Sequence, residues 1–163
     1  MINMNAQVTP NFTMKEAFDW INFFNRDKTF IEQYYKWCVE DFSPEKEQRL
    51  LREFKRLQAY RDAVNRKFPE FGGRIGVRIT SGVRPRLYEL EKGRSGNSRH
   101  ASWDAFDWVI TGVPEPQKSE IMKWLWLDID ANHSGGAAIS YRQDGTVAFI
   151  HTDGRGERKR WRY

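Results

Sequence analysis

Two histidines and two aspartates occur where their side chains could together bind a metal ion. His100 lies in the polar stretch Ser95–Asp107 (SGNSRHASWDAFD), and Asp107 follows it seven residues later. His151 and Asp153 lie near the end of the chain, in VAFIHTD. Two imidazole nitrogens and one carboxylate oxygen are a ligand set typical of catalytic zinc, which keeps a fourth position for water.

Alternating apolar residues predict the strands that would position these side chains. Asp104–Ile110 is one predicted strand, with Asp107 on a face of small and apolar residues. Thr146–Thr152 is another, and its alternation places His151 and Asp153 on one face. A bound zinc ion would neutralise the buried carboxylate and lower the pKa of a bound water towards about 7. From spacing alone, ordinary polar residues of the surface or core are the alternative.

The rest of the chain predicts helices first and strands later. The predicted helices cover 14–25, 29–39, 44–68 and 117–130, with a helical turn at 87–90, and the other predicted strands cover 75–82 and 137–141. Ser43 and Pro44 form a helix start, and Asp144-Gly145 indicates a hairpin turn. This order predicts an α+β domain spanning 1–163, with an antiparallel sheet of about four strands covered by helices.

Composition excludes several classes of protein. The chain has 163 residues and 15% aromatic residues, enough for one domain with a core and unlike a disordered chain. Cys38 is the only cysteine, so neither an intramolecular disulfide nor a thiolate zinc site can form. Neither a signal peptide nor a membrane-spanning stretch of about 20 apolar residues is present, which predicts synthesis in the cytoplasm. His133 is interpreted as a loop histidine.

The net charge of +5 is concentrated at the end of the chain. Residues 154–163 (GRGERKRWRY) hold five basic residues and one acidic residue, whereas the rest of the chain is nearly balanced. We expect this basic tail either to be a solvated terminus or to contact a polyanion, such as an anionic wall polymer or nucleic acid.

Several motifs together resemble one enzyme family. The pattern Ser98-x-His100-x₄-Ala105-x-Asp107 resembles the S-x-H-x-x-G-x-A-x-D motif of the zinc D-Ala-D-Ala carboxypeptidase and L-alanyl-D-glutamate endopeptidase family, which includes phage-type murein peptidases. Three further segments are similar to its SGYR, FVHVD and H-x-D…R-x-W motifs: ITSGVR, FIHTD and HTDGRGERKRW. NFTMKEAF resembles the entry to such domains, so the resemblance covers residues 11–161. It implies a hedgehog/D-Ala-D-Ala-peptidase-like fold.

The resemblance also implies roles for particular residues. His100, Asp107 and His151 would be the zinc ligands. Arg84 would bind a substrate carboxylate or stabilise the oxyanion, for which an always-charged, forked guanidinium is suited. Ser98 would support the site's loop or contact substrate. The reaction would be hydrolysis of a peptide bond in peptidoglycan stem peptides, with zinc polarising the carbonyl.

The chain departs from the family pattern at several positions. Ala148 stands where many relatives carry a glutamate base, so we expect Asp153 or a distant carboxylate to act as the base, or Asp153 to orient a ligand. Asp153 instead of His151 could also reach the metal. Trp103 stands at the expected glycine and would reshape the cleft and contact substrate, and Val83 replaces a tyrosine.

The expected function is therefore that of a zinc-dependent peptidoglycan peptidase, a D,D-carboxypeptidase or an endopeptidase. A phage lysis enzyme released by a holin, or a virion-borne enzyme, would reach the cell wall without a signal peptide. Two alternatives stay open. One is a non-catalytic virion, assembly or wall-binding component on the same scaffold, and the other is a basic nucleic-acid-binding domain, whose binding would be salt-sensitive and survive chelation.

Overall fold

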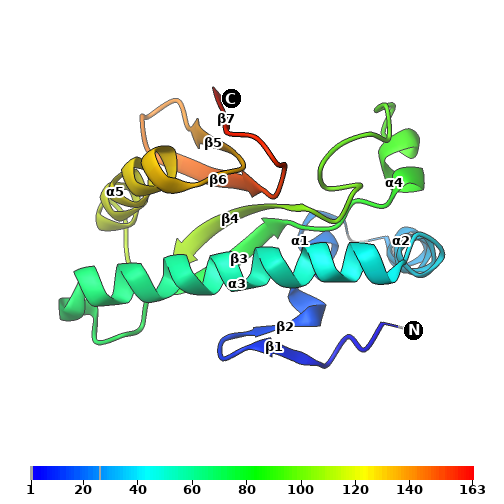
Figure 1. Cartoon of the computed structure of the whole chain (residues 1–163), viewed down its shortest axis with the longest axis horizontal. Helices are drawn as coiled ribbons and strands as arrows, with labels where there is room; N and C mark the ends of the chain where they lie inside the picture. Colours follow the sequence, from blue (N-terminus) through cyan, green and yellow to red (C-terminus); the bar gives the residue numbers. More distant parts are fainter. Residues whose placement is uncertain (1, 26) are drawn as a thin grey trace.

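A five-stranded mixed sheet forms the centre of the molecule, with the strand order β3-β4-β6-β5-β7 (Figure 1). The computed structural model describes residues 2–25 and 27–163. The strands of this sheet are β3 (Gly76–Ser81), β4 (Ala105–Thr111), β5 (Gly136–Tyr141), β6 (Val147–Asp153) and β7 (Lys159–Arg162). β3 pairs with β4, β4 with β6, and β5 with β6, all antiparallel, whereas β5 and β7 are parallel. The α+β class is as predicted.

The helices and a small hairpin complete the fold. The helical elements are η1 (Met14–Ala17), α1 (Ile21–Phe24), α2 (Lys28–Glu40), α3 (Pro44–Lys67), η2 (Pro69–Phe71), α4 (Arg86–Glu91) and α5 (Gln117–Asn132). β1 (Gln7–Thr9) and β2 (Phe12–Thr13) form a two-stranded sheet near the N-terminus. The helix predicted over 14–25 is divided into η1 and α1. Within the described ranges, no helix is long and apolar enough to cross a membrane.

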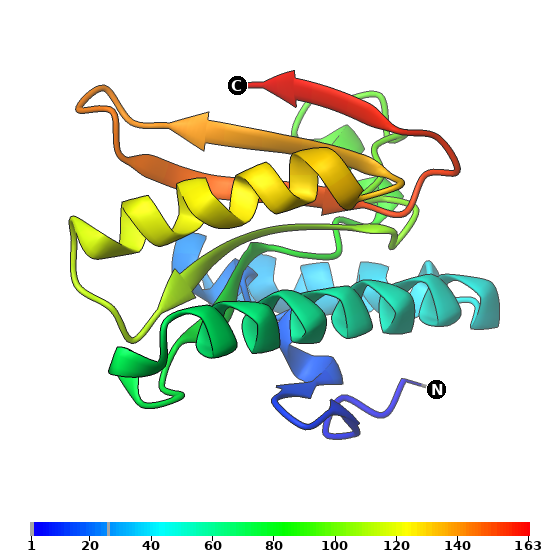
Figure 2. The ribbon, with the colours of Figure 1, turned by 60° about the vertical axis from the view of Figure 1, so that its left-hand side comes forward.

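Helices α3 and α5 pack on one face of the main sheet (Figure 2). Ser43 caps α3, because its hydroxyl accepts a hydrogen bond from the Lys46 N–H at 3.2 Å. In the core, the ring of Phe54 lies 5.1 Å from that of Phe106 on β4. Since neighbouring residues of a strand point to opposite faces, Asp107 projects from the other face of the sheet.

The predicted antiparallel sheet of about four strands is wrong in two respects, because β7 adds a fifth strand and is parallel. The predicted basic tail, residues 154–163, therefore contributes a strand of the sheet. Arg160 holds this strand in place by donating hydrogen bonds to three carbonyls. One is that of Ile129 (3.0 Å), in the last turn of α5, and the others are those of His133 (2.5 Å) and Gly135 (2.6 Å), just after the helix. These bonds use one of the charges that were expected to contact a polyanion.

Candidate metal centre

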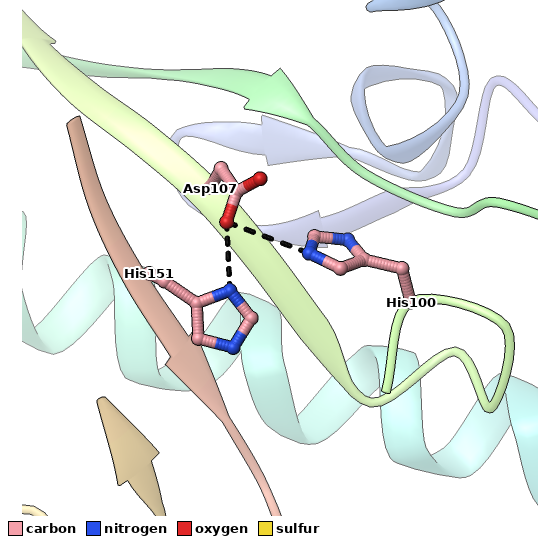
Figure 3. Close-up of side chains that lie close together, drawn as sticks. All are labelled: His100, Asp107 and His151. Carbon is pink, nitrogen blue, oxygen red and sulfur yellow. Dashed lines mark hydrogen bonds and ion pairs between the residues drawn. The ribbon is translucent and has the colours of Figure 1, made fainter. Parts of the chain in front are cut away.

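Asp107 and His151 form a cross-strand pair at the middle of the sheet. They are direct partners in the antiparallel register of β4 and β6, so their side chains lie on the same face. The distance from His151 Nδ1 to Asp107 Oδ1 is 2.7 Å. His100 approaches from the loop before β4, and its Nε2 lies 3.4 Å from the same carboxylate oxygen (Figure 3). One ligand atom from each residue lies within 4.8 Å of the others.

The donor set fits a metal ion that binds imidazole and carboxylate, and zinc is one such ion. Ligands about 2.0–2.1 Å from a tetrahedral zinc lie roughly 3.3 Å from one another, close to the His100–Asp107 distance of 3.4 Å. The His151–Asp107 distance of 2.7 Å is that of a hydrogen bond, so these two side chains would move apart slightly on binding zinc. His100 Nδ1 lies 2.8 Å from the Gly82 carbonyl, which only accepts, so Nδ1 carries the proton and Nε2 offers a lone pair. Nε2 is buried and has no hydrogen-bond partner among residues 2–25 and 27–163. A metal ion would satisfy this nitrogen.

Asp153 holds the other edge of the His151 ring. Its Oδ2 lies 3.2 Å from His151 Nε2, the nitrogen directed away from Asp107. Asp153 is itself fixed: it accepts hydrogen bonds from the backbone N–H groups of Gly136 and Arg155, both at 3.1 Å, and from the Arg155 guanidinium at 2.6 Å. A carboxylate that bonds the second nitrogen of a ligating imidazole fixes its tautomer and orientation.

The three titratable groups influence one another's charge. Burial alone would raise the pKa of Asp107, but the neighbouring His100 and His151 hold it well below its usual range. Burial alone would lower the pKa of His151, but its hydrogen bonds to Asp107 and Asp153 raise it. A metal at Nδ1 would replace a proton and leave the Nε2–H bond to Asp153 in place.

A cleft of about 310 Å³ opens beside Asp107. Its lining includes Arg84, Arg94, Trp20, Tyr88 and Asp107. Arg84, predicted from the resemblance to act on substrate, thus lies at the same cleft as one candidate ligand. Arg94 has no part in the sequence-based predictions, because nothing in its spacing indicates where its side chain lies.

Ser98 and Trp103 both support the loop that carries His100. The hydroxyl of Ser98 accepts a hydrogen bond from the Ala101 N–H at 3.1 Å, which corresponds to loop support, one of its two expected roles. Trp103 was expected to contact substrate, but only 1% of it is exposed. Its indole N–H donates to Asp41 at 3.0 Å and its ring packs on Phe18, so it is a core residue.

The backbone conformation at Trp103 is unusual for a residue other than glycine. Trp103 has φ +59°, in the left-handed region that glycine adopts most readily. The loop therefore has the conformation that a glycine would favour. The large ring is nevertheless buried in the core, where the removal of apolar surface from water stabilises the fold.

His133 is buried rather than a plain loop residue. Its Nδ1 accepts a hydrogen bond from the Tyr60 hydroxyl at 3.0 Å, and its Nε2 donates to the Asp153 backbone carbonyl at 3.0 Å. It therefore supports the end of β6 from outside the metal centre. Sequence reasoning missed this role, since a lone histidine beside glycines carries no signal for it.

A buried acidic pair lies behind the site. Glu53 on α3 and Asp104 are both almost completely buried. A Cβ added to Gly154 would lie 2.8 Å from Glu53 Oε1 and closer still to Asp104 Oδ1, so both carboxylates lie near this glycine. Glu53 is paired with Arg56, but burial raises the pKa of Glu53 to about 8.

Glu53→Gln should change how stability depends on pH. The folded-state pKa of about 8 lies above the ordinary 4.5, so the folded protein binds more protons between these values and loses stability as pH rises through that window. We expect the variant to be more stable than wild type by about 2 kcal/mol at pH 9. We expect no such gain at pH 5.

Urea unfolding at pH 5 and at pH 9 measures the difference in the free energy of unfolding, and Glu120→Gln, at an exposed position, is the control. A parallel pH dependence in wild type and Glu53→Gln would contradict it.

Comparison of the chain with protein-family models, with curated proteins and with solved structures found no match. The sequence motifs and the geometry of the centre are the features that bear on function. Both concern the same residues, His100, Asp107 and His151.

Proposed function

We propose that this chain is a zinc-dependent peptidase that hydrolyses a peptide bond in peptidoglycan stem peptides, as a D,D-carboxypeptidase or an endopeptidase with a hedgehog/D-Ala-D-Ala-peptidase-like fold. The observation that carries the proposal is that one ligand atom from each of His100, Asp107 and His151 lies within 4.8 Å of the others, beside a cleft. The motif resemblance supports the substrate class. In this proposal the enzyme acts at the cell wall in phage lysis or as part of a virion.

Each residue around the proposed zinc site has a separate role in hydrolysis. When bound, zinc supplies a Lewis acid for the scissile carbonyl and an activated water. Arg84 places a permanent positive charge beside this centre, where it would stabilise the oxyanion that forms on the carbonyl. The Gly82 carbonyl orients His100, and Asp153 orients His151.

We assign Asp153 to orientation rather than to general base catalysis. It is fully buried, and both of its oxygens accept hydrogen bonds from neighbouring residues. Among the described residues that line the cleft, Asp107 is the only carboxylate. This observation favours a second candidate function, a wall-binding or virion component that keeps the metal centre without hydrolysis.

Mass analysis of muropeptides released from purified sacculi tests the proposal. We expect the zinc-loaded protein to release cleaved stem peptides, and a chelator to stop the release. Zinc bound at about one ion per chain without any released peptide would favour the binding component. Absence of zinc after loading would contradict both functions.

The cell-wall contact proposed for the basic tail depends on fewer charges than the sequence suggested. Arg155 is bonded to Asp153, and Arg160 to backbone carbonyls after α5. Arg158 is 57% exposed and also contacts Asp130. Any attachment to anionic polymers would therefore use Arg158 with the neighbouring Lys159 and Arg162, and would be weak and screened by salt.

A further inference from the structure

Two guanidinium groups share one buried carboxylate at the side of the cleft formed by α4. Arg94 Nη1 lies 2.9 Å from Glu89 Oε1, and Arg84 Nε lies 3.4 Å from the same oxygen. Glu89 is only 2% exposed, whereas both arginines line the cleft. One carboxylate cannot neutralise two guanidinium groups, so this trio carries a net charge of +1, opposite in sign to that of Asp107, at the side of the cleft.

The two arginines occupy different depths. The Arg84 side chain is 19% exposed, and its backbone N–H donates to the His100 carbonyl at 3.2 Å, which ties it to the metal centre. The Arg94 side chain is 47% exposed, and its backbone N–H donates to the Glu89 carbonyl at 2.9 Å, beyond the end of α4. Arg94 therefore lies nearer the mouth of the cleft.

We propose that Arg94, held by Glu89, determines specificity by binding a free carboxylate of the substrate while Arg84 acts at the reacting carbonyl. This inference rests on the proposed function, and it restricts the substrates to stem peptides with an unamidated carboxylate near the scissile bond.

The chemistry of the cleft favours a carboxylate over other groups. A guanidinium binds the two oxygens of a carboxylate through parallel N–H donors. A carboxylate can pair with the charge of Arg94, whereas a neutral carboxamide offers no opposite charge and cannot accept both N–H donors. Trp20 and Tyr88 line the same cleft and offer apolar surface to the uncharged part of a peptide.

Amidation of the substrate provides the test. Synthetic stem peptides with lysine at the third position have two such carboxylates, one at the C-terminus and one on the glutamyl residue, and each can be replaced by a carboxamide of nearly the same shape. Three synthetic peptides are compared with zinc-loaded protein: unmodified, C-terminally amidated, and amidated at the glutamyl residue. The amidation that impairs cleavage by wild type identifies which carboxylate is bound.

Arg94→Gln should lower kcat/KM for the unmodified peptide by about 20-fold, the loss expected for one charge-assisted contact. For the peptide whose amidation impairs wild type, Arg94→Gln and wild type should have the same kcat/KM within about twofold. The amidation has already removed the contact that Arg94 makes, so the substitution removes nothing further. Arg86→Gln is the matched control, since Arg86 is an exposed arginine on the neighbouring helix α4 and lies outside the cleft lining. Arg94→Lys should recover part of the discrimination.

Several results would overturn the inference. One is an equal loss on amidated and unmodified peptides in Arg94→Gln, which would indicate a structural role. Another is a wild type that is indifferent to both amidations. If the zinc-loaded wild type cleaves none of the peptides, the proposed function fails, and NMR titration with the same peptides still decides the inference. Arg94→Gln must then bind the unmodified peptide no more tightly than its amide.

Discussion

Replacement of His100 by alanine will remove zinc binding and hydrolysis together. His100 contributes a buried nitrogen without a hydrogen-bond partner in the described part of the chain, directed at the Asp107 carboxylate. Without it, one imidazole and one carboxylate remain, which is too few for a stable zinc site. We expect zinc affinity to fall by more than about 100-fold, beyond the typical effect of losing an outer partner. Zinc competition with a chromophoric chelator and release of muropeptides measure the two losses.

His133→Ala is the matched control for this prediction. His133 is also a buried histidine, and its hydrogen bonds reach Tyr60 and the Asp153 backbone rather than the ligand cluster. The His133→Ala variant should have a lower free energy of unfolding than wild type, but its zinc affinity should stay within about tenfold of the wild-type value. Retention of zinc by His100→Ala, or the same loss in both variants, would mean that His100 is not a ligand.

Asp153→Asn separates two roles that the sequence left open. The substitution keeps the shape of the side chain but removes the charge that holds His151 Nε2 and the Arg155 guanidinium. If Asp153 orients His151, zinc affinity should fall by about 10–100-fold. The buried pairing with Arg155 is also lost, which should reduce the free energy of unfolding by about 3 kcal/mol.

Activity at saturating zinc completes this test. An orienting residue is needed mainly to hold the metal, so excess zinc should restore kcat/KM to within about tenfold of wild type. A general base is needed in every turnover, and its loss typically lowers the rate by about 10²–10⁴-fold. Unchanged zinc affinity with activity that excess zinc does not restore would therefore identify Asp153 as the base and contradict its assignment here.

Local sequence signals predicted the elements that position the site. Ser43, Pro44 and the apolar spacing that follows predicted α3, and its end at Lys67 precedes Pro69. Alternation predicted β4 and β6 and the faces of Asp107 and His151. The fifth strand could not be predicted in this way, because KRWR is mostly charged and its partner β5 is distant in sequence.

The sequence likewise predicted some residues of the candidate site but not how others are buried or paired. The motifs selected His100, Asp107 and His151, and the structure brings these three together. The burial of Trp103 and the contacts of Asp153 depend on tertiary packing, since an aromatic ring suits a core as well as a cleft wall. The clustering of Arg84, Glu89 and Arg94 depends on how α4 and its loop fold.

An anomalous difference map at the zinc absorption edge, from crystals of the zinc-loaded protein, tests the central claim most directly. We predict one strong peak about 2.0–2.2 Å from His100 Nε2, an Asp107 oxygen and His151 Nδ1. A loaded protein whose zinc lies elsewhere, or crystals that hold no zinc, would contradict the metal centre and the hydrolase proposed from it.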